Sequence, residues 1–438
     1  MTLSTATHEQ HLVIYFQVHQ PKRLRAFPFF DIGTNSGYFD DALNATIVKR
    51  IAQECYLPAN ALLLKLIKAN PKIKIAFSIS GTVIDQLVEY APEVVQSFRA
   101  LAKTGSVEFL AETDYHSLAC LVPGDEFETQ VANHMEKIYK HFGLRTTVLR
   151  NTELIYNDEL GRRAARMGFD GMITEGADRI LGYRSPHELY RHPDQHGVKL
   201  LLRNYHLSDE ISFRFRQGNH YLSVDQLMSS LNSIPPHLPL VNLAMDYETF
   251  GEHQKKETGI FAFLEGMLKA VVSQKKFTLS TPSEAIHCVE TDHVLSVPDF
   301  ISWADEARDL SAWLGNDLQN DAFGSVLKLQ QDIVVMSDTA LLDTWRNLTT
   351  SDHFYYMSTK KNNDGNVHAY FNHYPSPYEA FINYMNVVAD FTQRVHKAKQ
   401  AYDESTKQVM VEAERRDEHV PLWAQQFAGS YDHGHMGR

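Results

Sequence analysis

Over its first two-thirds the chain alternates between short apolar runs and longer amphipathic stretches. Seven of the runs have the composition of buried strands: "HLVIYFQVH", "IKIAFSIS", "SVEFLAET", "TTVLRNTE", "GFDGMITE", "KLLLRNYH" and "LPLVNLAMDYE". Helical periodicity occupies most of the intervals, for example residues 81–105 and 125–143, and the second stretch ends at Gly143 as helices often do. The order strand, helix, strand predicts a parallel sheet with crossover helices.

Seven such units in fewer than 300 residues favour a barrel of the (β/α) kind over residues 1–295. The run "KFTLSTPSEAI" is a candidate for an eighth, irregular strand. A doubly wound open sheet is the alternative, but no glycine-rich phosphate loop follows the first strand.

The pattern changes after residue 295. Residues 323–348 and 376–405 have helical periodicity and few β-rich runs. We therefore expect a helical region over 296–400 that packs on the barrel. Residues 401–438 are charged and lack clear periodicity, so they are expected to form a mobile tail.

Composition and charge exclude several classes of protein. Of the 438 residues 43% are hydrophobic and 22% are charged, as in ordinary globular proteins. The formal net charge of −12 lacks the basic footprint of a nucleic-acid binder. No apolar run approaches the roughly 20 residues of a membrane span. The three scattered cysteines and the start "MTLSTATHEQ", which has no signal-peptide pattern, favour a cytoplasmic protein.

Polar side chains collect where the predicted strands end. They are Gln17, His19 and Gln20 on strand one; Glu108, Glu112, Asp114 and His116 on strand three; Arg150, Asn151 and Glu153 on strand four; Arg203, Asn204 and His206 on strand six; and Asp246, Glu248, Glu252 and His253 on strand seven. In a parallel barrel these ends open onto one face, where active sites are built. Glu108 lies inside its strand and needs a partner, which is either a structural group or a ligand hydroxyl.

Two carboxyl groups at such a face are what glycoside hydrolysis requires, since one attacks the sugar and the other donates a proton. Amide and imidazole groups suit sugar hydroxyls, and tryptophan suits sugar ring faces. The segment "ISWADEARDLSAWLGN" places Trp303 and Trp313 around acidic residues. These tryptophans are either core residues or a stacking wall that closes the cleft.

Taken together, these segments resemble glycoside hydrolase family 57, the family of α-amylases and 4-α-glucanotransferases. Its five ordered motifs are matched in order by "HQP" from His19, "GSVEFL" from Gly105, "RNTELIYND" from Arg150, "MDYETFGEH" from Met245 and "WADEARDLSAWLGN" from Trp303. The resemblance covers roughly residues 11–390 and implies a (β/α)7 barrel, which is an incomplete TIM barrel, followed by a helical region that completes the active site.

The resemblance also implies residue roles. Glu153 is the expected nucleophile and Asp246 the expected acid/base of a retaining enzyme that acts on α-1,4-glucans. The residues expected to bind substrate are His19, Gln20, Glu108, Arg150, His206, Glu248, Trp303, Asp309 and Trp313. Arg150 stands where some members of the family have tryptophan, so the sugar pocket is expected to differ there. No cofactor and no metal site are predicted, and the oligomeric state is left open.

Three alternatives remain open at this point. The first is 4-α-glucanotransferase activity on maltooligosaccharides. The second is a metal-dependent hydrolase of the deacetylase type that uses His19, His116, His206 and His253, although no pair has compact ligand spacing. The third is a non-catalytic glucan-binding protein, against which the presence of both Glu153 and Asp246 argues.

Overall fold

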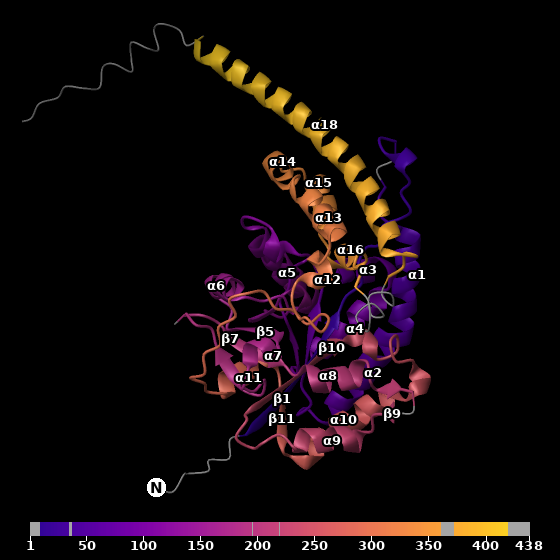
Figure 1. The fold of residues 1–438 in the computed structure, drawn as a ribbon, viewed down its shortest axis with the longest axis vertical. Coiled ribbons are helices and arrows are strands. Elements are labelled where there is room, and N and C mark those ends of the chain that lie inside the picture. Colours follow the sequence, from indigo (N-terminus) through magenta and orange to yellow (C-terminus); the bar gives the residue numbers. More distant parts are fainter. Residues whose placement is uncertain (1–8, 35–36, 195, 219, 361–371, 419–438) are drawn as a thin grey trace, which may run out of the picture.

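A computed structural model describes residues 9–34, 37–194, 196–218, 220–360 and 372–418 of the chain. In this part, seven parallel strands form one curled sheet in the order β3-β2-β1-β10-β7-β5-β4 (Figure 1). Their bounds are β1 Gln10–Val18, β2 Ile75–Ile79, β3 Val107–Phe109, β4 Val148–Arg150, β5 Gly171–Glu175, β7 Lys199–Arg203 and β10 Leu240–Asp246. A strand occurs in each of the seven apolar runs, so that prediction is confirmed.

The two ends of this strand order meet. Ala111, just beyond β3, forms a parallel bridge with Leu149 of β4. The sheet thereby curls into the incomplete (β/α)7 barrel that the sequence predicts. The inward side chains fill the barrel, among them Val13 and Tyr15 of β1 and Leu201 of β7, so the barrel is a packed core and not a pore.

The eighth strand is also present. β11 Phe277–Ser280 pairs in parallel with the first half of β1, while β2 pairs with the second half. A three-residue strand, β6 Leu189–Arg191, runs antiparallel to β7 and was not expected. A small hairpin of β8 Arg216–Gln217 and β9 His220–Tyr221 was also missed. Strands this short have no measurable periodicity in the sequence.

Helices surround the barrel. They are α1 Asp41–Ile51, α2 Leu57–Ala69, α3 Gly81–Tyr90, α4 Pro92–Ala102, α5 Glu126–Phe142, α6 Asp158–Arg166, α7 Asp178–Leu181, α8 Tyr205–Ser212, α9 Val224–Asn232, α10 Ile260–Gln274 and α11 Pro282–Cys288. The long periodic stretch at 81–105 divides at Pro92 into α3 and α4, because proline suits the first turn of a helix and not its interior. α5 ends where Gly143 adopts φ 73°, which glycine tolerates.

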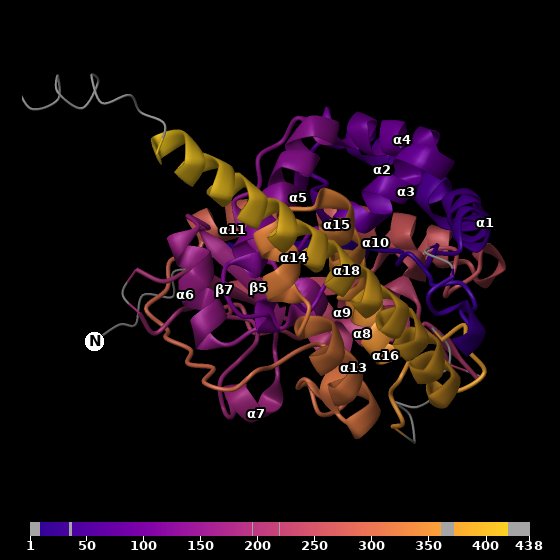
Figure 2. The same ribbon diagram turned by 90° about the horizontal axis from the view of Figure 1, so that it is seen from above.

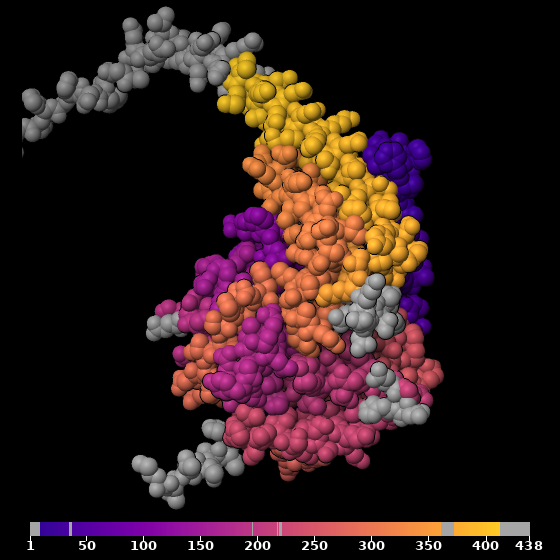
Figure 3. All heavy atoms as spheres, in the orientation of Figure 1, coloured from indigo at the N-terminus to yellow at the C-terminus, as the bar shows by residue number. Residues whose placement is uncertain are grey.

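The expected helical region follows. Its helices are α12 Ser311–Leu314, α13 Asp317–Leu327, α14 Gln330–Met336, α15 Thr339–Leu348, α16 Ser351–Tyr355 and α18 Pro377–Glu418. They lie over one end of the barrel, and α18 crosses above α13 and α14 (Figure 2). The space-filling view shows this region, in orange and yellow, resting directly on the magenta barrel (Figure 3).

The chain does not become irregular at residue 401. α18 continues to Glu418, so residues 401–418 are helical, in contrast to the expected aperiodic tail. The apolar stripe fades there, but ion pairs such as Lys399–Asp403, spaced i to i+4, support the helix. Residues 419–438 lie outside the described residues. None of the described helices is long and apolar enough to cross a bilayer.

Candidate active site

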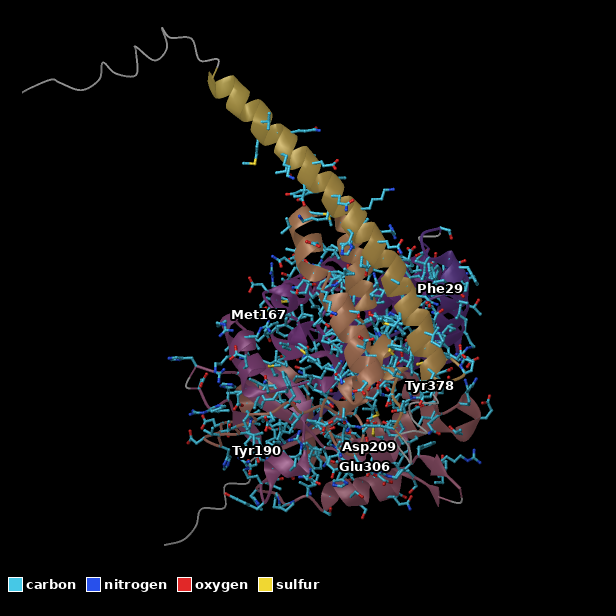
Figure 4. All side chains as sticks on the ribbon, turned by 45° about the horizontal axis from the view of Figure 1, so that its top comes forward. Phe29, Met167, Tyr190, Asp209, Glu306 and Tyr378 are labelled. Atoms are coloured by element: carbon cyan, nitrogen blue, oxygen red, sulfur yellow. The ribbon has the colours of Figure 1, made fainter. Side chains whose placement is uncertain are left out.

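The ends of β1, β4 and β10 place side chains around a cavity of about 410 Å³. Six of the residues predicted from the sequence line it: His19, Gln20, Glu153, Asp246, Glu248 and Trp303. The barrel contributes one side of the rim, and the loop that follows residue 302 contributes another. Asp209 from α8 and Glu306 from that loop both line the cavity, and Figure 4 labels both.

Glu153 lies just beyond β4, in the short 3-10 turn Thr152–Leu154. Its backbone is left-handed, with φ 58°, a conformation that costs energy for a residue other than glycine. Trp303 Nε1 donates to Glu153 Oε2 at 2.7 Å, and the Trp303 backbone N–H donates to the Glu153 carbonyl at 3.1 Å. Ser351 Oγ donates to Glu153 Oε1 at 2.9 Å. Two of the donors to this carboxylate therefore come from the region after residue 295.

The third donor to Glu153 is His116, whose Nε2 lies 3.3 Å from Glu153 Oε1. Its Nδ1 lies 3.0 Å from Glu112 Oε2, so the imidazole bridges two carboxylates. Burial alone would lower the pKa of His116, but the hydrogen bonds to Glu112 and Glu153 outweigh burial and raise this pKa to about 9. The ring is therefore a cation at neutral pH and donates to both neighbours.

His19 packs against this bridge. Its ring stacks on His116 with the centroids 3.9 Å apart. Both ring nitrogens are engaged, since Nδ1 lies 2.6 Å from Ser80 Oγ and Nε2 lies 2.9 Å from Asp352 Oδ2. Burial and the neighbouring charge of His116 lower the pKa of His19. The orientation of this ring at the cavity wall is thereby fixed.

The two carboxyls expected to be catalytic differ in their ionisation. Burial opposes the ionisation of Glu153, but the hydrogen bond and charge of His116 and the charge of Arg150 bring its pKa below the ordinary value. Burial and the negative charge of Glu153 raise the pKa of Asp246 to about 6. No hydrogen bond to the Asp246 carboxyl is formed by the described residues. Glu153 is therefore held as an anion, whereas Asp246 takes up a proton at a higher pH than an ordinary aspartate does.

Glu248 also lines this cavity, and it does so from a turn and not from the strand itself. An extended strand would have pointed it in the same direction as Asp246, whereas β10 ends at Asp246 and a 3-10 turn covers Tyr247–Thr249. The Tyr56 hydroxyl donates to Glu248, and Gln20 Nε2 donates to it at 3.4 Å. Burial and the charge of Asp246 raise the pKa of Glu248 to about 8, so this carboxyl is largely protonated at neutral pH.

Two predicted substrate-binding residues do not line the cavity. Arg150 is 0% exposed and does not line it. Glu108 accepts hydrogen bonds from Ser283 N at 3.0 Å and Ser283 Oγ at 2.9 Å, at the start of α11. A structural partner therefore satisfies Glu108 Oε2, while Glu108 Oε1 has no hydrogen-bond partner among the described residues.

Three more predicted residues are not brought to the cavity. His206 is exposed and its ring contacts the neighbouring Tyr205. Asp309 accepts a hydrogen bond from the Ser311 backbone at 2.8 Å. Trp313 is 1% exposed and belongs to the apolar core between the barrel and the helices. Of the two tryptophans, only Trp303 reaches the cavity, so the structure does not support a stacking role for Trp313.

Sequence reasoning missed part of the lining. The additional residues include Arg23, Arg203, Asp209, Phe213, Asp305, Arg308, Asp352, Tyr355 and Tyr356. Arg203 and His116 belong to strand ends that had been noted for their polarity, so this signal was present. Phe213 and Asp352 follow or lie within helices, where no strand-end rule applies.

Among the described parts of the chain, no group of three or more His, Cys, Asp or Glu side chains is placed to hold a metal ion. Of the four histidines considered as ligands, His19 and His116 stack on each other and His253 lines the cavity, but His206 lies outside it.

Known proteins resemble this chain over most of its length. A Methanocaldococcus jannaschii protein described as a candidate alpha-amylase is 39% identical over 414 residues, which cover 90% of this chain and 86% of that protein. The crystal structure of the 4-alpha-glucanotransferase from Thermococcus litoralis matches with a TM-score of 0.61 at 15% identity, over 79% of this chain and 56% of that one. A GH57 branching enzyme from Thermococcus kodakaraensis matches with a TM-score of 0.62 at 13% identity, over 83% of this chain and 87% of that one.

At such low identity, the two crystal structures show a shared fold. The family itself is shown by sequence, because the family model described as glycosyl hydrolase family 57 matches residues 13–298. The resemblance drawn from the five motifs is thereby confirmed. The chain is an enzyme of the glycoside hydrolase class, and it belongs to glycosyl hydrolase family 57.

Proposed function

We propose that this enzyme is a retaining glycosidase that cleaves α-1,4-glucans by double displacement, with Glu153 as nucleophile and Asp246 as acid/base. The observation that carries the proposal is that the pKa values of two carboxyls at one cavity are shifted in opposite directions. The lowered pKa of Glu153 and the raised pKa of Asp246 match the two roles, because the nucleophile must be an anion and the acid must hold a proton.

In the first step, a Glu153 oxygen forms a bond to the anomeric carbon while Asp246 gives its proton to the leaving glycosidic oxygen. Glycosylation removes the negative charge of Glu153, and the pKa of Asp246 then falls. Asp246 can now take a proton from water, which attacks the anomeric carbon and releases Glu153. Two inversions restore the original configuration.

The substrate class rests on two supports. The relative from Methanocaldococcus jannaschii is described as a candidate alpha-amylase and aligns with 90% of this chain. The cavity wall combines aromatic side chains, such as Phe213 and Tyr355, with charged and amide groups, a mixture that suits sugar ring faces and hydroxyls.

The decisive experiment is the Glu153→Gln variant assayed on maltooligosaccharides. We expect kcat to fall by several orders of magnitude with an unchanged melting temperature, because the variant has no carboxylate at the position from which the proposed nucleophile attacks. Azide added to Glu153→Gly should yield a glycosyl azide of inverted configuration. Near-normal turnover by Glu153→Gln would refute the assignment.

Two further measurements complete the test. NMR of the first product should show the α-anomer, whereas the β-anomer would exclude retention. Products separated by size distinguish hydrolysis, which shortens the pool of chains, from transfer to another glucan, which makes both longer and shorter chains.

A further inference from the structure

Arg150 raises a question that substrate binding does not answer. Its guanidinium is 0% exposed and does not line the cavity, so no sugar can reach it. None of its three nitrogens forms a hydrogen bond with a described residue. A buried cation without hydrogen-bond acceptors is costly, and its retention here needs a reason.

The contacts of Arg150 lead to the nucleophile. Its guanidinium carbon lies 4.8 Å from the centre of the Trp303 ring, and its Nη1 lies 3.6 Å from Glu112 Oε2. Arg203 approaches the same indole, with its guanidinium carbon 5.7 Å from the ring centre. A guanidinium this close to a ring centre is attracted to the face of the ring and so favours one orientation of the indole.

The plane of Trp303 matters because its indole N–H donates to Glu153 Oε2 at 2.7 Å. Glu112, the other neighbour of Arg150, accepts a hydrogen bond from His116, which also donates to Glu153. Arg150 therefore contacts one of the three donors that hold the nucleophile, Trp303, directly and reaches a second, His116, through Glu112.

We propose that Arg150 is a positioning residue, which holds the Trp303 indole and the Glu112–His116 bridge against Glu153 and keeps a fixed positive charge behind both catalytic carboxyls. The inference rests on the proposed roles of Glu153 and Asp246. It replaces direct substrate binding as the role of this arginine.

The electrostatics agree with this geometry. Titratable and charged groups from six elements surround Arg150 and the two carboxyls. They are Tyr15 of β1, Glu112 and His116 beyond β3, Glu153 beyond β4, Arg203 of β7, Asp246 of β10 and Asp352 of α16. Burial is the largest effect on Glu153 and Asp246, and it raises the pKa of both groups. The charge of Arg150 is among the effects that lower these two pKa values. Removal of Arg150 should therefore raise both.

The test compares Arg150→Met with Arg163→Met. Arg163 is a matched control, because its guanidinium carbon lies 4.8 Å from the Phe127 ring and it pairs with Glu128, but it does not line the cavity. For Arg150→Met we expect kcat on maltooligosaccharides to fall by about 10²-fold, with little change in KM. Both limbs of the pH profile of kcat/KM should move up by about one unit. Arg163→Met should move neither limb.

Arg150→Lys separates charge from stacking. Lysine keeps the cation, so the pH limbs should stay near their wild-type positions, while the loss of the planar stack should still lower kcat. If Arg150→Met lowers the melting temperature as Arg163→Met does and leaves the pH limbs in place, Arg150 is only structural and the proposal is wrong.

A double-mutant cycle keeps the proposal testable if Arg150→Met fails to fold. Trp303→Phe removes the N–H that bonds Glu153 but keeps a ring. If Arg150 acts through Trp303, the losses in kcat caused by Arg150→Lys and Trp303→Phe should be less than additive. Full additivity would overturn the inference. Failure of the proposed function is recognised separately, since Glu153→Gln would then retain turnover.

Discussion

The Ser351 hydroxyl provides the smallest change that tests whether the region after residue 295 is part of the catalytic centre. Ser351 begins α16, is fully buried and donates to Glu153 Oε1 at 2.9 Å. Ser351→Ala removes one oxygen atom from this contact and leaves the helix intact. The second donor to that oxygen, His116, lies farther away at 3.3 Å, so Ser351 makes the shorter bond.

The magnitude follows from the charge of the acceptor. A hydrogen bond to an ionised group contributes about 1.5–3 kcal/mol, and one pKa unit corresponds to about 1.4 kcal/mol. The bond favours the Glu153 anion, so its loss raises the pKa of Glu153. Because His116 and Trp303 remain, we expect the lower end of the range, which is about one unit. The acidic limb of kcat/KM should therefore move up by about one unit in Ser351→Ala.

The assay is the pH dependence of kcat/KM on a maltooligosaccharide, measured by the release of reducing ends. Thr344→Ala is the control, because Thr344 lies on α15 in the same region and its hydroxyl donates only to the Ala340 carbonyl of its own helix, at 2.9 Å. Thr344→Ala should leave the profile unchanged. An acidic limb that stays in place in Ser351→Ala, with the melting temperature preserved, would show that the hydroxyl does not stabilise the Glu153 anion.

Three further variants test the surrounding site. Asp246→Asn should abolish turnover of glucans but still form the glycosyl-enzyme from activated aryl glycosides, which need little protonation; equally slow reaction with both would point to Glu248 as the proton donor. Trp313→Ala should lower the free energy of unfolding by about 3–5 kcal/mol and leave KM unchanged, since Trp313 is a core residue. A raised KM in a protein of normal stability would show instead that Trp313 contacts the substrate. Phe213 lines the cavity yet is 48% exposed, so Phe213→Ala should raise KM for long oligosaccharides without lowering the melting temperature; unchanged kinetics would exclude a sugar contact there.

The barrel could be predicted because parallel strands that are buried on both faces appear in the sequence as continuous apolar runs. All nine residues of β1 are buried, as its run indicates. The shortest strands were not predicted. β6, for example, has only three residues and gives no periodic signal in the sequence. The extent of α18 was also missed, since its last turns are supported by charged pairs and lack an apolar stripe.

The candidate site could be predicted only where it follows the ends of strands. That rule found Glu153 and Asp246 because the carboxyl ends of parallel strands share one face. The same rule grouped Glu108 with the residues of the cavity, but Glu108 does not line it. A residue in the middle of a three-residue strand need not reach the rim. It could not find Ser351 or Asp352, which approach the cavity from a helix whose packing is not visible in the sequence.

The division of roles between the two carboxyls depends on contacts made by distant parts of the chain. Burial raises the pKa of both groups, so burial alone cannot make one a nucleophile and the other an acid. Glu153 differs because it accepts hydrogen bonds from His116, Trp303 and Ser351, whereas the described residues offer no hydrogen bond to Asp246. Two of these donors belong to the helical region, so a barrel that ended at residue 295 would keep the acid, and would keep His116 and Arg150 beside the nucleophile, but it would lose two of the three hydrogen bonds that hold the Glu153 carboxylate. The helical region is therefore part of the proposed catalytic centre and not only a cover for the barrel.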